Sequence, residues 1–234
     1  MTQRLLTSAL FAGFVAGLLA ALLHFALVQD LILQAETYET GEVTHFAGAE
    51  AAHDHAADTP AHGHAGEGDS GVGRNLLTVL FTSLIYVGYA LLMVAGFGVA
   101  STLGLRIGLR EGLLWGIAGF ATFQLAPAAG LAPELPGTMA ADLTDRQIWW
   151  WGTVLATAAA LALLGYGRKP HLVIAGAVLL ALPHVIGAPH PGSYAGVAPP
   201  ELAASFAARV LAVGLVVWAS LGALAGWIWN RNPA

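Results

Sequence analysis

Residues able to bind a metal ion are concentrated in one polar stretch of the chain. Five of the nine histidines lie between residues 45 and 64, and four of them form two His-x-His pairs. Imidazole and carboxylate groups together suit divalent Zn, Ni, Co or Cu, whereas thiolate ligands are excluded because the chain has no cysteine. This composition predicts a metal-capture segment, the alternative being a solvated connector that is merely rich in histidine. The predicted capture residues are His45, His53, Asp54, His55, His62 and His64.

The overall composition predicts a membrane protein. Hydrophobic residues make up 57% of the 234 residues and charged residues only 10%, against about 25% charged in soluble domains. The single lysine, Lys169, is not part of a P-loop, and the sequence contains no H-E-x-x-H or G-x-S-x-G motif. We therefore expect no enzyme activity, no tightly bound cofactor and no nucleic-acid partner.

Long apolar runs predict an all-α integral membrane protein with about six transmembrane helices in a single membrane domain. Between the first two runs, residues 30–74 are predicted to form a flexible His/Asp-rich outer loop. The fifth run is short against the roughly 20 residues that a bilayer requires, so its flanks must extend it or it must be broken or re-entrant. The predicted spans are residues 5–28, 76–100, 113–131, 144–166, 172–186 and 200–229.

Local motifs predict how these helices pack and end. Three Gly-x-x-x-Gly motifs, at residues 13–17, 112–116 and 222–226, are typical of helices whose backbones approach closely in lipid. Pro127 is expected to end the third span near the membrane surface. Thr144 has capping-box spacing from Gln147 and is predicted to be the N-cap of the fourth span.

The positions of the basic residues predict the orientation. With a cytoplasmic N-terminus, six of the nine basic residues fall on the cytoplasmic side, which the positive-inside rule favours. The C-terminus is then also cytoplasmic, and the outer helix ends carry most of the polar side chains. We predict a metal-binding vestibule there, formed by Gln124, Glu134, His184 and His190. The alternative is that the outer loops are simply longer and so hold more polar residues.

Four further motifs follow one another along the chain and carry a family resemblance. They are Phe123-Gln124-Leu125-Ala126-Pro127, Pro133-Glu134-Leu135-Pro136-Gly137, Asp145-Arg146-Gln147-Ile148-Trp149-Trp150-Trp151-Gly152 and Pro183-His184-Val185-Ile186-Gly187-Ala188-Pro189. With this series the chain resembles the CbtA family of predicted cobalt transporter subunits in bacterial inner membranes. The resemblance implies a role in cobalt supply for cobalamin and a small single-span companion subunit.

The predicted function is uptake of a divalent transition metal. Co²⁺ is favoured by the resemblance, since the residue chemistry accepts Ni²⁺ and Zn²⁺ equally well. No acidic pair or histidine series runs through the span centres, so the pore could require the companion subunit or a second copy of the chain. The alternative function is a membrane-anchored metal-binding or scaffold subunit that delivers metal to a separate permease.

Overall fold

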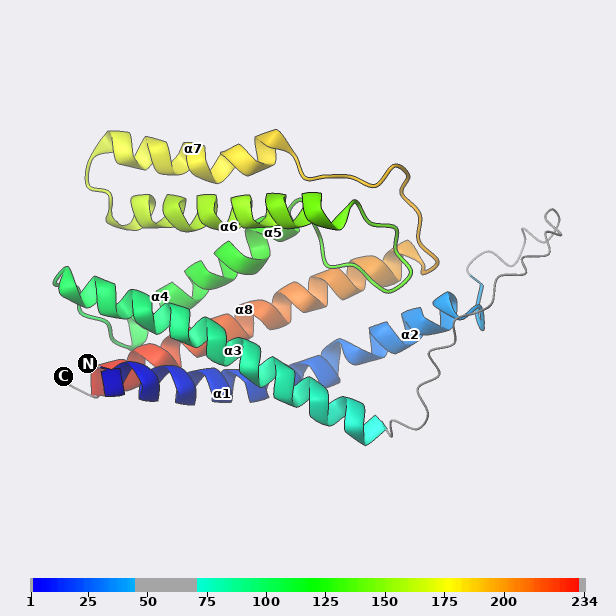
Figure 1. Cartoon of the computed structure of the whole chain (residues 1–234), viewed down its shortest axis with the longest axis horizontal. Coiled ribbons are helices and arrows are strands. Elements are labelled where there is room, and N and C mark those ends of the chain that lie inside the picture. The colour runs from blue at the N-terminus through cyan, green and yellow to red at the C-terminus, as the bar shows by residue number, and fades with distance from the viewer. Residues whose placement is uncertain (1, 45–70, 232–234) are drawn as a thin grey trace.

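Helices account for nearly all of the regular structure in the part of the chain that is described, which comprises residues 2–44 and 71–231 of a computed structural model (Figure 1). These residues contain no strand, only an isolated bridge between Thr138 and Gly196. The elements are α1 (Thr2–Leu27), α2 (Gln29–Glu39), α3 (Gly71–Thr102), α4 (Leu109–Phe120), the π-helical turn η1 (Ala121–Leu125), α5 (Ala126–Ala128), α6 (Leu143–Tyr166), α7 (Pro170–Ile186) and α8 (Pro200–Arg231).

Four of the described helices are long and apolar enough to cross a membrane, namely α1, α3, α6 and α8. The other two predicted spans correspond to the continuous segment α4–η1–α5 and to α7, which has 17 residues. Pro127 does not end the third span at once, because the helix continues through it to Ala128. The all-helical fold class is confirmed, and four of its helices have spanning length.

Glycine allows α1 to approach α3 closely. A Cβ atom added to Gly13 would lie 2.6 Å from the Cα atom of Val87, and one added to Gly17 would overlap the backbone of Ser83. Three alanines of α1, Ala9, Ala12 and Ala16, are also buried, in a cluster that contains residues of both α3 and α8. The predicted role of the Gly13–Gly17 motif is confirmed.

The other two Gly-x-x-x-Gly motifs pack against each other where α4 crosses α8. A Cβ atom on Gly112 would overlap the carbonyl oxygen of Gly222, and one on Gly116 would overlap that of Trp218. From the opposite side, a Cβ atom on Gly226 would lie 2.9 Å from the Cα atom of Gly112. Backbone therefore faces backbone across this crossing, as the small residues predict.

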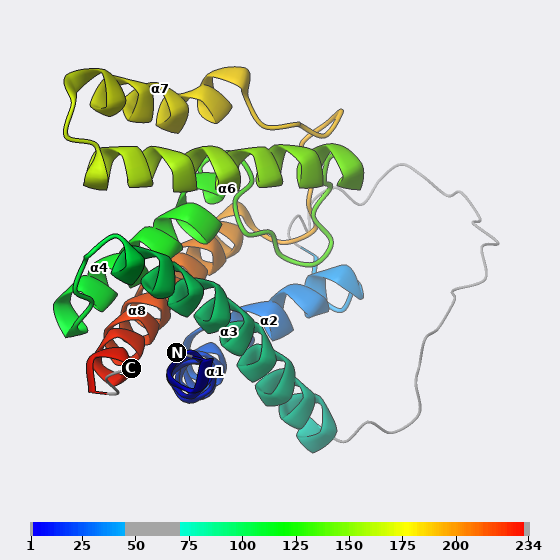
Figure 2. The same cartoon turned by 60° about the vertical axis from the view of Figure 1, so that its left-hand side comes forward.

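Helices α6 and α7 form an antiparallel hairpin beside the remaining helices (Figures 1 and 2). Among the described elements, α7 packs on α6 alone, while α6 also contacts α4, η1 and α5. At the end of the hairpin away from the α6–α7 turn, the indole N–H of Trp149 donates to the carbonyl oxygen of Pro183 at 3.2 Å. The hairpin is thus attached to the bundle mainly through the short segment that contains η1.

The predicted outer loop over residues 30–74 is wrong at both ends. Residues 29–39 form α2, and α3 already begins at Gly71. Leu31 and Ala35, one helical turn apart, are buried in α2 and pack in a cluster with Leu135 and Phe206. This i, i+4 apolar pair is a helical signal that the polar composition of the stretch hides.

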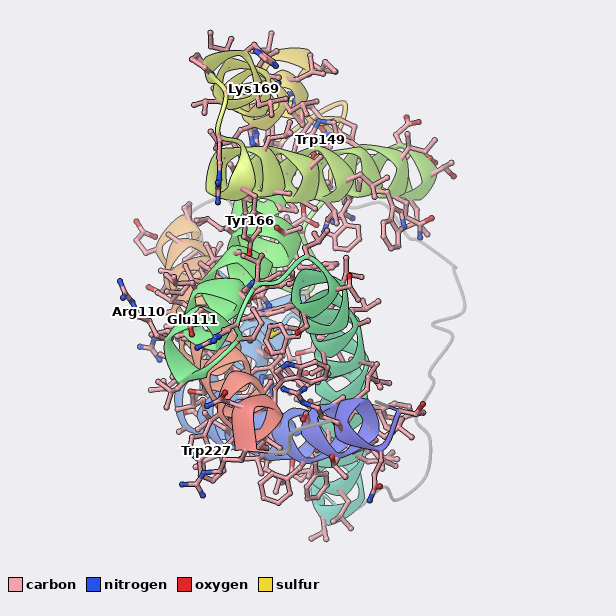
Figure 3. All side chains as sticks on the ribbon, turned by 90° about the vertical axis from the view of Figure 1, so that its left-hand side faces the viewer. Arg110, Glu111, Trp149, Tyr166, Lys169 and Trp227 are labelled. Atoms are coloured by element: carbon pink, nitrogen blue, oxygen red, sulfur yellow. The ribbon has the colours of Figure 1, made fainter. Side chains whose placement is uncertain are left out.

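Six basic residues lie at one end of the bundle. This end faces the viewer in Figure 3, where Arg110 and Lys169 are labelled. Both ends of the described chain lie there too (Figure 1). The adjacent turns contain Arg4, Arg106, Arg110, Arg168, Lys169 and Arg231. The helices therefore alternate in direction as the charge pattern requires.

Two arginines link α1 and α8 reciprocally. The Nε atom of Arg4 donates to the carbonyl oxygen of Trp229 at 2.8 Å, and the guanidinium also lies over the Trp229 ring at 4.0 Å. At the other end, Nη1 of Arg209 donates to the carbonyl oxygen of Leu27 at 3.0 Å. Each arginine thus supplies a positive donor to the carbonyl end of the other helix.

The N-cap of α6 differs from the prediction. Helix α6 begins at Leu143, and the side chain of Asp142 accepts hydrogen bonds from the backbone N–H groups of Thr144 and Asp145 at 2.8 and 3.3 Å. Thr144 is therefore inside the first turn. Asp142 and Thr144 are both good capping residues, and the helix begins two residues earlier than the capping-box spacing indicates.

Candidate functional site

A cavity of about 760 Å³ lies between the first half of α6, the η1–α5 segment and α8, at the end of the bundle opposite the basic turns. Four of the residues lining it are polar, and the remainder are aromatic, aliphatic or proline. The polar residues are Gln124, Glu134, Arg146 and Gln147. The apolar residues are Phe123, Pro127, Ala128, Leu131, Ala132, Pro133, Leu143, Trp150, Trp151, Val210 and Leu211.

Gln124 reaches this cavity because the helix widens at η1. Pro127 lacks an N–H and its ring clashes with the carbonyl of the residue four positions earlier, so a regular α-helical turn is unfavourable there. The backbone N–H of Ala126 instead donates to the carbonyl of Ala121, five residues back. Such π turns are rare and occur frequently at functional sites.

The amide of Gln124 lies against a glycine of α8. A Cβ atom at position 214 would overlap Oε1 of Gln124, so Gly214 makes room for the amide. Oε1 is buried and accepts no hydrogen bond from the described residues. An unsatisfied buried acceptor is costly, and because Oε1 has almost no accessible surface, a molecule in the cavity can reach only other atoms of this side chain.

Glu134 and Arg146 form an ion pair on the cavity wall. Nη2 of Arg146 donates to Oε2 of Glu134 at 2.9 Å, and both side chains are about one-third exposed. Leu135, the neighbour of Glu134, is only 3% exposed and packs against α2. The buried leucine therefore fixes the loop that presents the carboxylate to the cavity.

An aromatic layer lies behind the cavity. Phe123 lines the cavity and stacks on Trp218, with ring centroids 5.5 Å apart and planes 8° apart. Tyr89 of α3 contacts both rings, at 5.1 Å from Phe123 and 4.7 Å from Trp218. The cavity thus ends at a packed apolar layer.

The two vestibule histidines lie outside the cavity lining. His184 is exposed in the last turn of α7 and packs edge-on against Trp149, with ring centroids 6.1 Å apart. His190 follows in the next loop, where Nδ1 shares a hydrogen bond of 2.9 Å with the Tyr194 hydroxyl. Of the four predicted vestibule residues, the structure brings Gln124 and Glu134 to one cavity.

The capture residues lie outside the described part of the chain. These are His45, His53, Asp54, His55, His62 and His64. Within residues 2–44 and 71–231, no three His, Asp or Glu side chains are close enough together to hold a metal ion.

A smaller cavity of about 110 Å³ lies where α1 passes into α2, beside the start of α3. His24 and Glu36 both line it, so two residues with metal-ligand chemistry face the same space. The guanidinium of Arg74 also lines this cavity and opposes the binding of a cation there.

Nearly the whole chain matches one known protein family. A family model with the description "Probable cobalt transporter subunit (CbtA)" matches residues 2–230. The chain belongs to the CbtA family. The resemblance seen in the sequence motifs is therefore confirmed over nearly the whole chain. No curated protein and no solved structure matches it. Membership in CbtA makes the chain a metal-transport subunit, and a subunit implies a partner.

Two features of the CbtA cavity were not predicted from the sequence. The ion pair joins Glu134 and Arg146, which are 12 residues apart with one proline, Pro136, between them, and this spacing has no periodic signal. The π turn was also missed, although Pro127, placed inside an apolar run three residues after Gln124, was a usable sign of a helix irregularity.

Proposed function

We propose that this CbtA chain is the membrane subunit for uptake of a divalent transition-metal cation, with Co²⁺ for cobalamin supply as its cargo. The family match supports transport of a metal. The observation that supports the site is the cavity at the end opposite the basic turns, where the Gln124 amide and the Glu134 carboxylate share one space. The proposal contains no catalytic step.

The proposed topology has six spans in the bacterial inner membrane, with both termini cytoplasmic. The basic turns at one end support this orientation, since cytoplasmic loops carry an excess of Lys and Arg. The segment α4–η1–α5 covers residues 109–128 and, at 1.5 Å per residue, is about 30 Å long, which matches the hydrocarbon core. Helix α7 reaches only about 25 Å and needs its flanking residues to complete a span.

In this proposal, metal moves from the outer loop to the cavity and then between the helices. His45, His53, Asp54, His55, His62 and His64 capture the ion at low concentration. Gln124, Glu134, His184 and His190 receive it at the outer end of the bundle. A small single-span companion subunit, or a second copy of the chain, supplies the missing part of the path.

A second candidate function is a membrane-anchored metal-binding or scaffold subunit that delivers metal to a separate permease. The aromatic layer formed by Phe123, Trp218 and Tyr89 favours this alternative, because it places apolar rings directly behind the cavity. A metal ion crossing that layer would lose polar contacts.

Uptake of Co²⁺ into proteoliposomes distinguishes the two functions. The transporter proposal expects metal-specific uptake by the chain, either alone or together with its partner subunit. The scaffold function would be established by a different result. The partner subunit alone would then take up Co²⁺, and addition of this chain would only lower the Co²⁺ concentration at which uptake begins.

Two variants separate capture from passage. Replacing the histidines between residues 53 and 64 by serine is expected to weaken uptake mainly at scarce metal, because these residues only concentrate the ion. His184→Ala is expected to abolish uptake at every concentration. Equal and concentration-independent losses in both variants would contradict this division of roles.

A further inference from the structure

The size and walls of the large cavity do not match a hydrated metal ion. A divalent ion with six water molecules occupies roughly 200 Å³, at about 30 Å³ per water. The cavity of about 760 Å³ is several times larger and falls in the range of small-molecule sites, about 300–1,000 Å³. Its walls, with Phe123, Trp150 and Trp151, offer aromatic surface that a hydration shell cannot use.

The charges in the cavity also do not favour a free dication. Among the described residues that line it, Glu134 is the one acidic residue, and Arg146 pairs with this carboxylate at 2.9 Å. The other polar side chains of the lining are the amides of Gln124 and Gln147. Since no three His, Asp or Glu side chains come together in the described parts of the chain, the described lining offers few ligands to replace the water molecules of a bare ion.

These same groups suit a metal that is already enclosed by organic ligands. Such a complex can be neutral, so it does not require an acidic site, and its rings can stack on Trp150 and Trp151. Its N–H groups and carboxylates can pair with the side-chain amides of Gln124 and Gln147, which both line the cavity. Its carboxylates can accept hydrogen bonds from Arg146, whose side chain donates only to Glu134 within the described chain.

We propose that the cavity between α6, η1–α5 and α8 binds its divalent metal as a neutral complex with small amino-acid-type chelators that carry a ring, an N–H donor and a carboxylate. This inference rests on the proposed transport function and names the form in which the cargo enters. Binding involves no covalent step. The metal keeps its organic ligands, and the cavity recognises their outer surface.

The test uses the full chain in lipid nanodiscs under an oxygen-free atmosphere. The probe is the neutral complex of one Co²⁺ with two deprotonated histidines, and the comparisons are Co²⁺ in a non-coordinating buffer and histidine alone. The five histidines of residues 45–64 are replaced by serine so that the loop does not contribute. Affinity is measured by equilibrium dialysis, and proximity by quenching of tryptophan fluorescence.

The complex is expected to bind at least about tenfold more tightly than either comparison ligand, a difference of about 1.4 kcal/mol. Trp151→Phe should remove much of the fluorescence quenching, because Trp151 lines the cavity. Trp227→Phe is the matched control, because Trp227 lies at the far end of α8, and this variant should leave the quenching unchanged (Figure 3). Gln124→Leu should weaken binding of the complex about tenfold, the cost of one buried hydrogen bond.

Tighter binding of uncomplexed Co²⁺, or binding of the complex that neither Trp151→Phe nor Gln124→Leu changes, would overturn the proposal. An absence of binding by the complex would also overturn it and would mean that lipid or a partner helix fills the cavity. Proteoliposome uptake keeps the two hypotheses separate. Uptake of uncomplexed Co²⁺ without binding of the complex refutes this inference alone, whereas binding of the complex without uptake of cobalt in any form refutes the transport function.

Discussion

Replacing Gly222 by alanine should destabilise the bundle at the crossing of α4 and α8. The added Cβ atom would overlap the carbonyl oxygen of Gly112 and lie 2.6 Å from the Cα atom of Gly116, about 0.8 Å short of the 3.4 Å at which ordinary contact begins. Both neighbours are backbone atoms, so only separation of the two helices can relieve the overlap. A gap of this size forfeits roughly a quarter to a half of each dispersion contact along the crossing.

The expected cost of Gly222→Ala is about 2 kcal/mol, within the usual range of about 1–3 kcal/mol for overpacking. For a chain of this length, that change lowers Tm by roughly 4–8 °C. Intrinsic tryptophan fluorescence during heating of the purified protein in detergent measures this shift. Gly152→Ala is the matched control, because a Cβ atom at Gly152 of α6 meets no atom within 4 Å.

Gly152→Ala is expected to leave Tm unchanged or raise it, since alanine is favoured over glycine in a helix by about 0.5–1 kcal/mol. The two variants add the same methyl group to a glycine inside a membrane helix. We conclude that glycine is required at position 222 by close backbone packing and not by helix propensity. Changes in Tm of the same sign and size in both variants would refute this conclusion.

Three further substitutions test individual hydrogen bonds. Arg209→Met, which removes the donor to the Leu27 carbonyl, should lower the free energy of unfolding by about 1 kcal/mol in detergent, and Arg209→Lys should recover part of it. Trp149→Phe should speed amide hydrogen exchange at the C-terminal end of α7, because the Pro183 carbonyl loses its indole donor, and unchanged exchange would show that this bond does not hold the hairpin. Glu134→Gln should change thermal stability by less than about 1 kcal/mol, as is usual for an exposed ion pair, and a larger loss would mean that the pair organises the whole loop.

The long apolar runs and the glycine motifs could be predicted because membrane helices follow simple rules. A span requires an uninterrupted apolar segment, and close helix packing in lipid requires small residues at fixed spacing. The glycines at positions 13, 17, 112, 116, 222 and 226 lie at helix contacts for that reason. Their partners could not be predicted, since the motif at residues 222–226 could equally have paired with that at residues 13–17.

Features that depend on tertiary contacts were not predictable in the same way. Helix α2 is polar in composition, and the burial of Leu31 and Ala35 against Leu135 and Phe206, which are distant in sequence, helps to stabilise it. Gln124 was identified as a site residue because it is a polar side chain near the predicted outer end of a span, three residues before Pro127. The π turn that directs it, and Gly214 which makes room for it, depend on the packing of α8.

The reciprocal arginine bonds between α1 and α8 have a consequence for the order of folding. Arg4 donates to a carbonyl 225 residues further along the chain, and Arg209 donates to one 182 residues earlier. Helix α8 also packs on α1, α3 and α4, and it follows every other described helix. During synthesis, α1 and α3 can pair early, but the carbonyl end of α1 receives its donor only after α8 has been made. The core is therefore completed late, and a chain truncated before α8 would leave the glycine faces of α4 and the buried alanines of α1 exposed to lipid.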